Sequence, residues 1–227
     1  MQPSSAALSR ALLAHSGATV IAGSPVRGWY EDGDHVVVRS ARATVRARWL
    51  LLATNAWSAR IHPYFHQKVT PMRGQIYLTE PGPLLFETAG YSHYGYYYYR
   101  QIPEAEDPTR GRWLIGGARH RNFATENNVL DESTGDAVQR DLERWTATHF
   151  PEFAELPVAH RWAGLMAFTS DGQPLVGTLP EQPKVGFAVG FNGHGMGLGI
   201  LVVRQALAHL IDGEPSRLFD ARRLDRT

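Results

Sequence analysis

A glycine-rich segment, residues 190–199 (GFNGHGMGLG), is the part of the sequence best suited to chemistry. It follows a predicted strand at 184–191 and precedes a predicted helix at 196–212. Glycine has no Cβ, so backbone amides there can approach a ligand closely, and the amides at a helix N-terminus attract negative charge. The segment therefore predicts a site for a group that is, or becomes, negative. A tight turn whose small residues serve only packing explains the pattern equally well.

The spacing of these glycines excludes the two common phosphate-binding patterns. After Gly193 and Gly195, the third glycine of a G-x-G-x-x-G motif would fall at Leu198, and no Gly-Lys-Ser/Thr follows as in a P-loop. A flavin ring fits better, because its N1–C2=O edge gains negative charge on reduction and a helix N-terminus would stabilise that charge.

Composition narrows the class of protein. The chain has 227 residues, 43% of them hydrophobic, and a net charge of +1, which is typical of a globular domain and gives no strong field for nucleic acid or an anionic membrane. It has no cysteine, which excludes disulfides, thiolate metal sites and a cysteine-tethered flavin. The sequence shows no leader and no long apolar run, so we predict no membrane span and a cytoplasmic location.

Other site patterns are weaker. His62 and His66 are four residues apart, but Pro63 and the lack of a nearby carboxylate argue against a metal pair, and we predict no metal site. There is no G-x-S-x-G sequence, so a hydrolase triad has no support.

Hydrophobic periodicity and turn residues predict an α+β (mixed α/β) chain with mostly antiparallel pairing in its middle. Alternation on both sides of Asp32-Gly33 predicts a hairpin. Helices are expected after Ser4-Ser5 as far as Gly17, at 133–149 and at 196–212. Strands are expected at 19–22, 26–30, 35–39, 43–47, 49–53, 69–80, 94–102, 112–117, 158–169 and 184–191.

Five stretches, in order, resemble the D-amino-acid oxidase-like family of FAD-dependent oxidoreductases, which includes glycine oxidase, sarcosine oxidase, D-amino-acid dehydrogenases and γ-glutamylputrescine oxidase. Together they cover nearly the whole chain. They are WLLLATNAW at 49–57, PMRGQ at 71–75, YYR at 98–100 with LIGG at 114–117, RWAG at 161–164 with DGQPLVG at 171–177, and GHGM at 193–196.

The resemblance implies FAD as cofactor and a reaction in which a hydride passes from an amine or amino acid to the flavin, leaving an imine. It also implies an incomplete FAD-binding domain at 1–70, an antiparallel substrate-binding domain at 71–160, and a return to the FAD-binding domain at 161–227. The family's N-terminal Rossmann βαβ segment is missing, so we expect a truncated chain or a separate N-terminal FAD-binding chain. An exposed sheet edge would also favour a homo-oligomer.

Site residues follow from the same resemblance, and no catalytic residue is assigned. The residues expected to bind the cofactor are Val26, Ala53, Thr54, Trp57, Gly193, His194, Gly195, Met196 and Gly197. The residues expected to line the substrate pocket are Tyr97, Tyr99, Arg100 and Met166.

Four departures limit the resemblance. No G-x-G-x-x-G occurs, Asn55 stands where the family usually has glycine, and no lysine follows the closing loop as in sarcosine oxidase. Met166 stands where α-amino-acid oxidases of this kind often place an arginine for the substrate carboxylate, which favours an amine substrate. Two other functions stay open: an accessory or remnant subunit that does not bind FAD alone, and a binding module for small amines.

Overall fold

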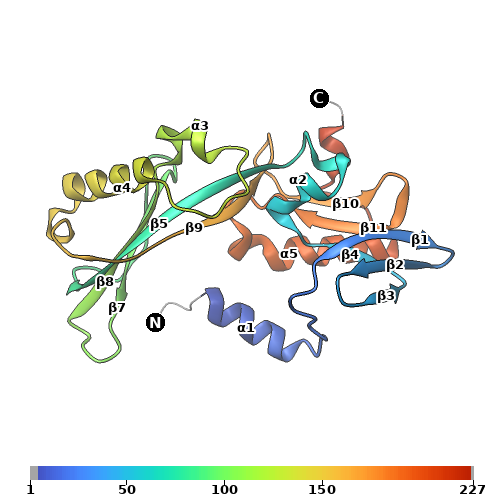
Figure 1. The fold of residues 1–227 in the computed structure, drawn as a ribbon, viewed down its shortest axis with the longest axis horizontal. Helices are drawn as coiled ribbons and strands as arrows, with labels where there is room; N and C mark the ends of the chain where they lie inside the picture. Colours follow the sequence, from blue (N-terminus) through green and yellow to red (C-terminus); the bar gives the residue numbers. More distant parts are fainter. Residues whose placement is uncertain (1–4, 226–227) are drawn as a thin grey trace. The chain divides into compact units, whose positions relative to one another are not determined.

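The computed structural model describes residues 5–225, which form two compact units (Figure 1). Among the described residues, unit 1 comprises 5–54 and 173–225, and unit 2 is the continuous segment Asn55–Gly172. Residues 55–70 and 161–172 therefore lie with the antiparallel sheet, whereas the predicted boundaries at 70 and 160 put them with the cofactor domain. Strand pairing explains this difference, because the strand that ends at Phe168 pairs with the strand that begins at Thr70.

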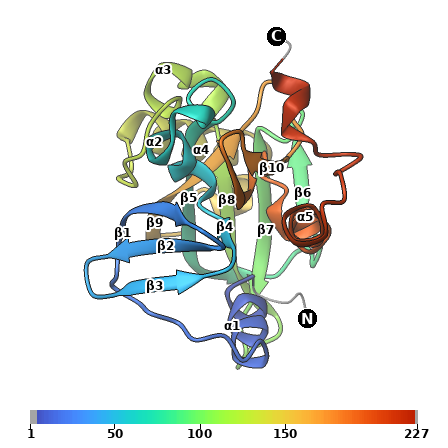
Figure 2. The same cartoon turned by 90° about the vertical axis from the view of Figure 1, so that its right-hand side faces the viewer.

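Unit 1 begins with helix α1 (Ser5–His15), and the expected capping residue Ser4 lies outside the described residues. A three-stranded antiparallel sheet follows, made of β1 (Val26–Asp32), β2 (His35–Ser40) and β3 (Thr44–Ala47), as Figure 2 shows. The predicted hairpin is confirmed: Asp32 pairs with His35, and Gly33 between them has φ +58°. The strand predicted at 19–22 is wrong, since those exposed residues pair with no other strand.

The second sheet of unit 1 has the order β10-β11-β4, and β4 runs parallel to β11. Its strands are β4 (Leu50–Leu52), β10 (Leu175–Leu179) and β11 (Gln182–Val189). Helix α5 (Gly195–Leu207) follows β11, and a π-helical turn extends it to Asp212. Val202 and Ala206 of α5 are buried in a core with Val176 and Ala188 of the sheet. The predicted helix at 196–212 is therefore confirmed, while β10 is a strand that the sequence patterns missed.

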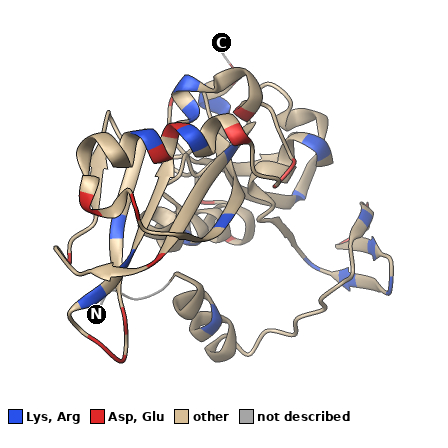
Figure 3. Ribbon diagram, turned by 60° about the vertical axis from the view of Figure 1, so that its left-hand side comes forward, with Lys and Arg blue, Asp and Glu red and all other residues tan. Residues whose placement is uncertain are grey.

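Unit 2 is built on a five-stranded antiparallel sheet of order β6-β7-β8-β5-β9. The strands are β5 (Thr70–Pro83), β6 (Gly90–Ser92), β7 (Tyr97–Pro103), β8 (Arg110–Gly117) and β9 (Val158–Phe168). Helix α4 (Asp136–His149) covers one face of the sheet and buries Val138 and Leu142 in its core. Acidic and basic residues are mixed along the outer side of α4 (Figure 3), as is usual for a solvated helix face.

Short helices connect these elements in unit 2. They are α2 (Ser58–Ile61), α3 (Phe123–Glu126) and 3-10 turns at Asn55–Trp57, Pro63–Phe65, Arg119–Arg121 and Pro151–Phe153.

One helical stretch, Gly195–Asp212, is long and apolar enough to cross a membrane by length and composition alone, although we predict no membrane span. A single helix of this kind is weak evidence, because helices of soluble domains pass the same test. Here the helix packs on β10 and β11 through Val202 and Ala206 and leaves Met196 and Ile200 exposed. We therefore describe it as a sheet-packed helix with an uncovered apolar face.

Asn55, which stands where the family usually has glycine, has a left-handed backbone with φ +41°, a conformation that asparagine tolerates. We predict that Asn55→Ala lowers the free energy of unfolding by about 1–2 kcal/mol more than Asn55→Gly does, because only the alanine carries a Cβ in this conformation. Both variants lose the same amide, so the difference in their urea denaturation curves isolates the backbone term. Equal losses would show that φ is not the constraint at this position.

Candidate functional site

The carboxyl ends of β4 and β11 lie at one edge of their sheet, because the two strands are parallel. Leu52, the last residue of β4, is paired with Phe187, two residues before the end of β11. Thr54 and Gly190 therefore leave the sheet on the same side. In open sheets with parallel strands this edge is the usual place for ligands. The edge joins Ala53 and Thr54 to the glycine-rich turn, so the structure brings together two groups of predicted cofactor residues.

The glycine-rich turn is held in a defined shape by its own backbone. Gly190, Asn192 and Gly193 all have positive φ, at +74°, +53° and +80°. The His194 amide donates to the Phe191 carbonyl at 2.8 Å, and the Asn192 side chain donates to the Gly190 carbonyl at 2.5 Å. The glycines at 190 and 193 are thus needed for conformation as well as for ligand access.

The first turn of α5 is open. The amides of Gly197 and Leu198 both donate to the His194 carbonyl, whereas those of Gly195 and Met196 find no acceptor among residues 5–225. A Cβ placed on Gly197 would meet nothing within 4 Å in this chain. The turn is therefore not packed shut, and its free amides and open space fit a planar ring with a negative edge.

Two predicted cofactor residues lie apart from this turn along the chain. Val26 is the first residue of β1 and is exposed, and Trp57 closes a short 3-10 helix in unit 2 and is also exposed. Their expected places beside the adenine and the flavin remain predictions.

Tyr97 and Tyr99 lie on the face of the unit 2 sheet that α4 covers. The Tyr97 ring stacks on Trp145 at a centroid distance of 4.8 Å and is only 3% exposed, and Tyr99 packs on the rings of Trp113 and Phe150 at 5.4 and 5.0 Å. These contacts make both tyrosines part of the core cluster. We therefore do not carry them into the proposed substrate site, although the resemblance points to them.

Tyr98 lies on the opposite, uncovered face, because side chains alternate along a strand. Its ring lies against Gly116, where an added Cβ would come within 2.4 Å of Tyr98 Cε2. A Cβ on Gly74 would likewise lie 2.7 Å from Met166 Cε and 3.4 Å from Tyr98 Oη. Tyr98 and the predicted pocket residue Met166 therefore both lie against Gly74. Arg100 shares this face with Tyr98, since it lies two residues further along β7.

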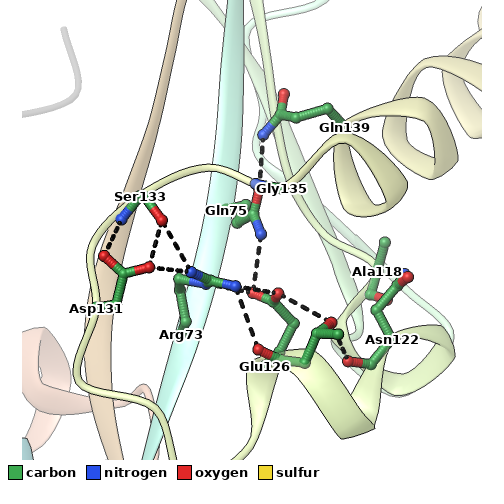
Figure 4. A network of polar contacts seen from close by, with 10 residues as sticks. Arg73, Gln75, Ala118, Asn122, Glu126, Asp131, Ser133, Gly135 and Gln139 are labelled. Carbon is green, nitrogen blue, oxygen red and sulfur yellow. Dashed lines mark hydrogen bonds and ion pairs between the residues drawn. The ribbon is translucent and has the colours of Figure 1, made fainter.

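The residues on either side of Gly74 point into unit 2 and anchor β5 (Figure 4). Arg73 donates to Glu126 through Nε at 3.0 Å and Nη2 at 2.8 Å, and to Asp131 through Nη1 at 2.8 Å. Gln75 donates to Glu126 at 2.9 Å and accepts from the Gly135 amide. The hydrogen bond with Glu126 is the main cause that raises the Arg73 pKa. This network fixes the strand that carries Gly74.

His62 serves the local backbone. Its Nδ1 accepts a hydrogen bond from the Tyr64 amide at 3.2 Å and so caps the 3-10 helix Pro63–Phe65. Burial, and then the nearby His66, lower the His62 pKa. Among residues 5–225 no group of three or more His, Cys, Asp or Glu side chains is arranged to hold a metal ion.

Proteins that are similar to this chain in sequence include oxidoreductases. The chain is 31% identical over 192 residues to a glycine oxidase from Pseudomonas aeruginosa, an alignment that covers 83% of this chain and 48% of the relative. It is 25% identical to a probable oxidoreductase, OrdL, from Rhizobium meliloti, covering 80% of this chain and 40% of the relative. The chain therefore spans about half the length of the curated relatives it matches.

Solved structures show the same fold. Glycine oxidase from Geobacillus kaustophilus superposes with a TM-score of 0.75 at 22% identity, covering 94% of this chain and 54% of that one. L-Proline dehydrogenase from P. horikoshii gives the same TM-score and identity, covering 97% of this chain and 59% of that one. The family profile described as FAD dependent oxidoreductase matches residues 4–208. The turn at the sheet edge, the antiparallel sheet of unit 2 and these matches agree, and the chain belongs to the family of FAD-dependent oxidoreductases.

Proposed function

We propose that this chain forms part of an FAD-dependent enzyme that oxidises a C–N bond of an amine or amino acid to an imine. The observation that carries the proposal is the open first turn of α5, with the free amides of Gly195 and Met196 at the carboxyl edge of the sheet. Family membership and the names of the relatives, glycine oxidase above all, support the same reaction class.

When bound, the flavin supplies the acceptor for two electrons. The amides of Gly195 and Met196 would stabilise the negative charge that reduction brings to the ring edge. Gly193 and Gly197 would leave room for the ring, and Ala53 and Thr54 would border it at the end of β4. In the substrate the α-carbon would give up a hydride to this acceptor, and the nitrogen lone pair would form the C=N bond of an iminium ion. Loss of an N–H proton from the iminium to water would then leave the imine. We assign no side chain as a base, because a neutral amine needs none.

A second function is a non-catalytic or accessory subunit that binds FAD only with another polypeptide. One observation favours it. Helix α5 exposes an apolar face that includes Met196 and Ile200, and the π-helical turn that extends it exposes Ile211. A separate dinucleotide-binding chain, or a second copy of this chain, would cover such a face.

Flavin absorbance separates these two functions. Under the first, the purified chain is yellow, or becomes yellow with saturable quenching of flavin fluorescence when FAD is added. Under the second, the chain stays colourless with FAD alone and takes it up only when the N-terminal half of the Pseudomonas aeruginosa glycine oxidase is supplied as a separate polypeptide. Protein that takes up no FAD in either experiment contradicts the flavin assignment.

We predict that Gly197→Val weakens FAD binding about 5- to 150-fold without unfolding the chain. A Cβ added at Gly197 meets no other atom of this chain within 4 Å. The valine side chain would occupy the space assigned to the ring, and overpacking of this kind costs about 1–3 kcal/mol. Titration with FAD measures the change, and circular dichroism verifies folding. Gly28→Val on β1 is the matched control, since an added Cβ there is also unobstructed. Equal FAD affinity of the two variants would place the ring elsewhere.

A further inference from the structure

The uncovered face of the unit 2 sheet is apolar around Gly74 and Gly116. Strand alternation and register place Ile76, Trp162 and Met166 on it, together with Phe168 two residues beyond Met166. Two polar groups interrupt this surface. One is the hydroxyl of Tyr98, and the other is the guanidinium of Arg119, which begins the 3-10 helix Arg119–Arg121 just after β8. A few polar groups on an apolar lining are characteristic of small-molecule sites.

Arg119 is half-buried, and its charge has no anionic partner in the described part of the chain. Its guanidinium carbon lies over the rings of Phe168 and Tyr96, at 4.8 and 5.3 Å from their centroids. No carboxylate or carbonyl within residues 5–225 accepts a hydrogen bond from it. Other arginines of unit 2 differ, since Arg73 pairs with Glu126 and Arg112 with Glu80 and Glu104. A partly desolvated guanidinium without an acceptor is costly, and binding an anion would satisfy its charge and its N–H donors.

The Tyr98 hydroxyl is the second available group. It makes no hydrogen bond with any residue between 5 and 225. Burial raises the Tyr98 pKa to about 12, and the positive charge of Arg119 acts in the opposite direction. The hydroxyl is therefore neutral at physiological pH and able to donate, and it lies close enough to Arg119 to feel its charge.

Met166 shows what kind of ligand would suit this face. Its methyl group and the Tyr98 hydroxyl both lie against Gly74, and a thioether cannot pair with a carboxylate. Phe168, which shares its strand and face, carries the Arg119 guanidinium over its ring. The Arg119 guanidinium therefore lies beside Phe168, two residues along β9 from Met166. Its neighbours there are apolar side chains.

We propose that Arg119 determines substrate specificity by binding the carboxylate of the substrate, with the Tyr98 hydroxyl as a second donor and Met166 against the substrate's apolar part. This inference rests on the proposed function and deepens it: the substrate is an amine that also carries a carboxylate, whereas the methionine at 166 taken alone favours a simple amine. A planar guanidinium can hold a carboxylate through two parallel hydrogen bonds.

The test observes the methyl group of Met166 and needs no flavin. The chain has four methionines, so protein labelled with 13C at the methionine methyl gives a simple NMR spectrum, and Met166→Leu identifies the resonance. Propionate is titrated as the carboxylate probe and propionamide as its neutral counterpart. We expect propionate to shift the Met166 resonance saturably and propionamide to leave it unchanged.

Substitutions then assign the effect to Arg119. Arg119→Gln should weaken propionate binding at least about tenfold, and Arg119→Lys should weaken it less. Arg121→Gln, two residues away on the exposed side of the same turn, should bind as the unaltered chain does. The Met72 resonance reports whether each variant is folded.

Three results would overturn the inference: no shift with propionate, an equal shift with propionamide, or unchanged affinity in Arg119→Gln. None of these results depends on FAD uptake. A chain that binds FAD but not propionate would contradict only the assignment of the substrate carboxylate to Arg119. A chain that binds propionate but not FAD would contradict only the flavin assignment.

Discussion

The substitution Glu126→Ala should lower the free energy of unfolding of unit 2 by about 3–5 kcal/mol, because it leaves a buried guanidinium without its main counter-charge. Glu126 accepts two hydrogen bonds from Arg73 and one from Gln75, and both members of the ion pair are buried. Urea denaturation, followed by tryptophan fluorescence and circular dichroism, measures the loss.

Asp131→Asn is the matched control for this prediction. Asp131 also pairs with Arg73, at 2.8 Å, but its side chain is 61% exposed, so water can replace the contact. We expect a far smaller effect than that of Glu126→Ala. The double variant Arg73→Met with Glu126→Leu should recover much of the loss, because it removes both charges together. If Glu126→Ala and Asp131→Asn were equally harmful, burial would not be what makes the first pair important.

Trp113→Ala is the second large effect that we expect, with a loss of about 3–5 kcal/mol. The Trp113 side chain is fully buried, stacks on Phe153 at 4.6 Å, and donates through Nε1 to the Thr146 hydroxyl at 3.1 Å. Removing the indole leaves a cavity between the sheet and α4 and takes one donor from Thr146. The same denaturation experiment measures it.

Trp162→Ala serves as control for the second prediction, because Trp162 lies in the same unit but is 38% exposed. Its loss should be clearly smaller, since less apolar surface returns to water. Thermal melting should rank the two variants in the same order. A Trp113→Ala chain as stable as Trp162→Ala would mean that the aromatic cluster relaxes to fill the space.

Local patterns were enough to predict much of the fold. The hairpin around Gly33, the helix at 136–149 and the antiparallel strands of unit 2 each follow from turn residues or periodicity within a few residues. The glycine-rich turn was predicted in the same way, since a strand, a run of glycines and a helix are consecutive in sequence. Interactions that are short in sequence are encoded in short patterns.

Local sequence patterns did not predict the features that depend on contacts between residues far apart in the sequence. Arg73 and Glu126 are 53 residues apart, and nothing near either one indicates the other. The strand predicted at 19–22 has suitable residues but no neighbour to pair with, and β10 became a strand because β11 lies beside it.

The residues considered for the substrate site could not be fully predicted from local patterns either. Alternation along β7 indicates that neighbouring tyrosines point to opposite faces, but only the position of α4 shows that Tyr97 and Tyr99 are the covered ones. No sequence motif indicated a role for Arg119. Its importance comes from the absence of an acceptor in the described chain, which is a property of the folded unit.

The division of the chain has a consequence for the order of folding. Unit 2 is one continuous segment, so all its strands are available once Gly172 has left the ribosome. The sheet of unit 1 instead pairs Leu50 with Val185, and β4 must wait for a strand made much later. Contacts of such long sequence separation form slowly, because the loop between them must close first. We therefore expect unit 1, which carries the glycine-rich turn, to fold last during synthesis. Until then the apolar strand β4 has no strand to pair with.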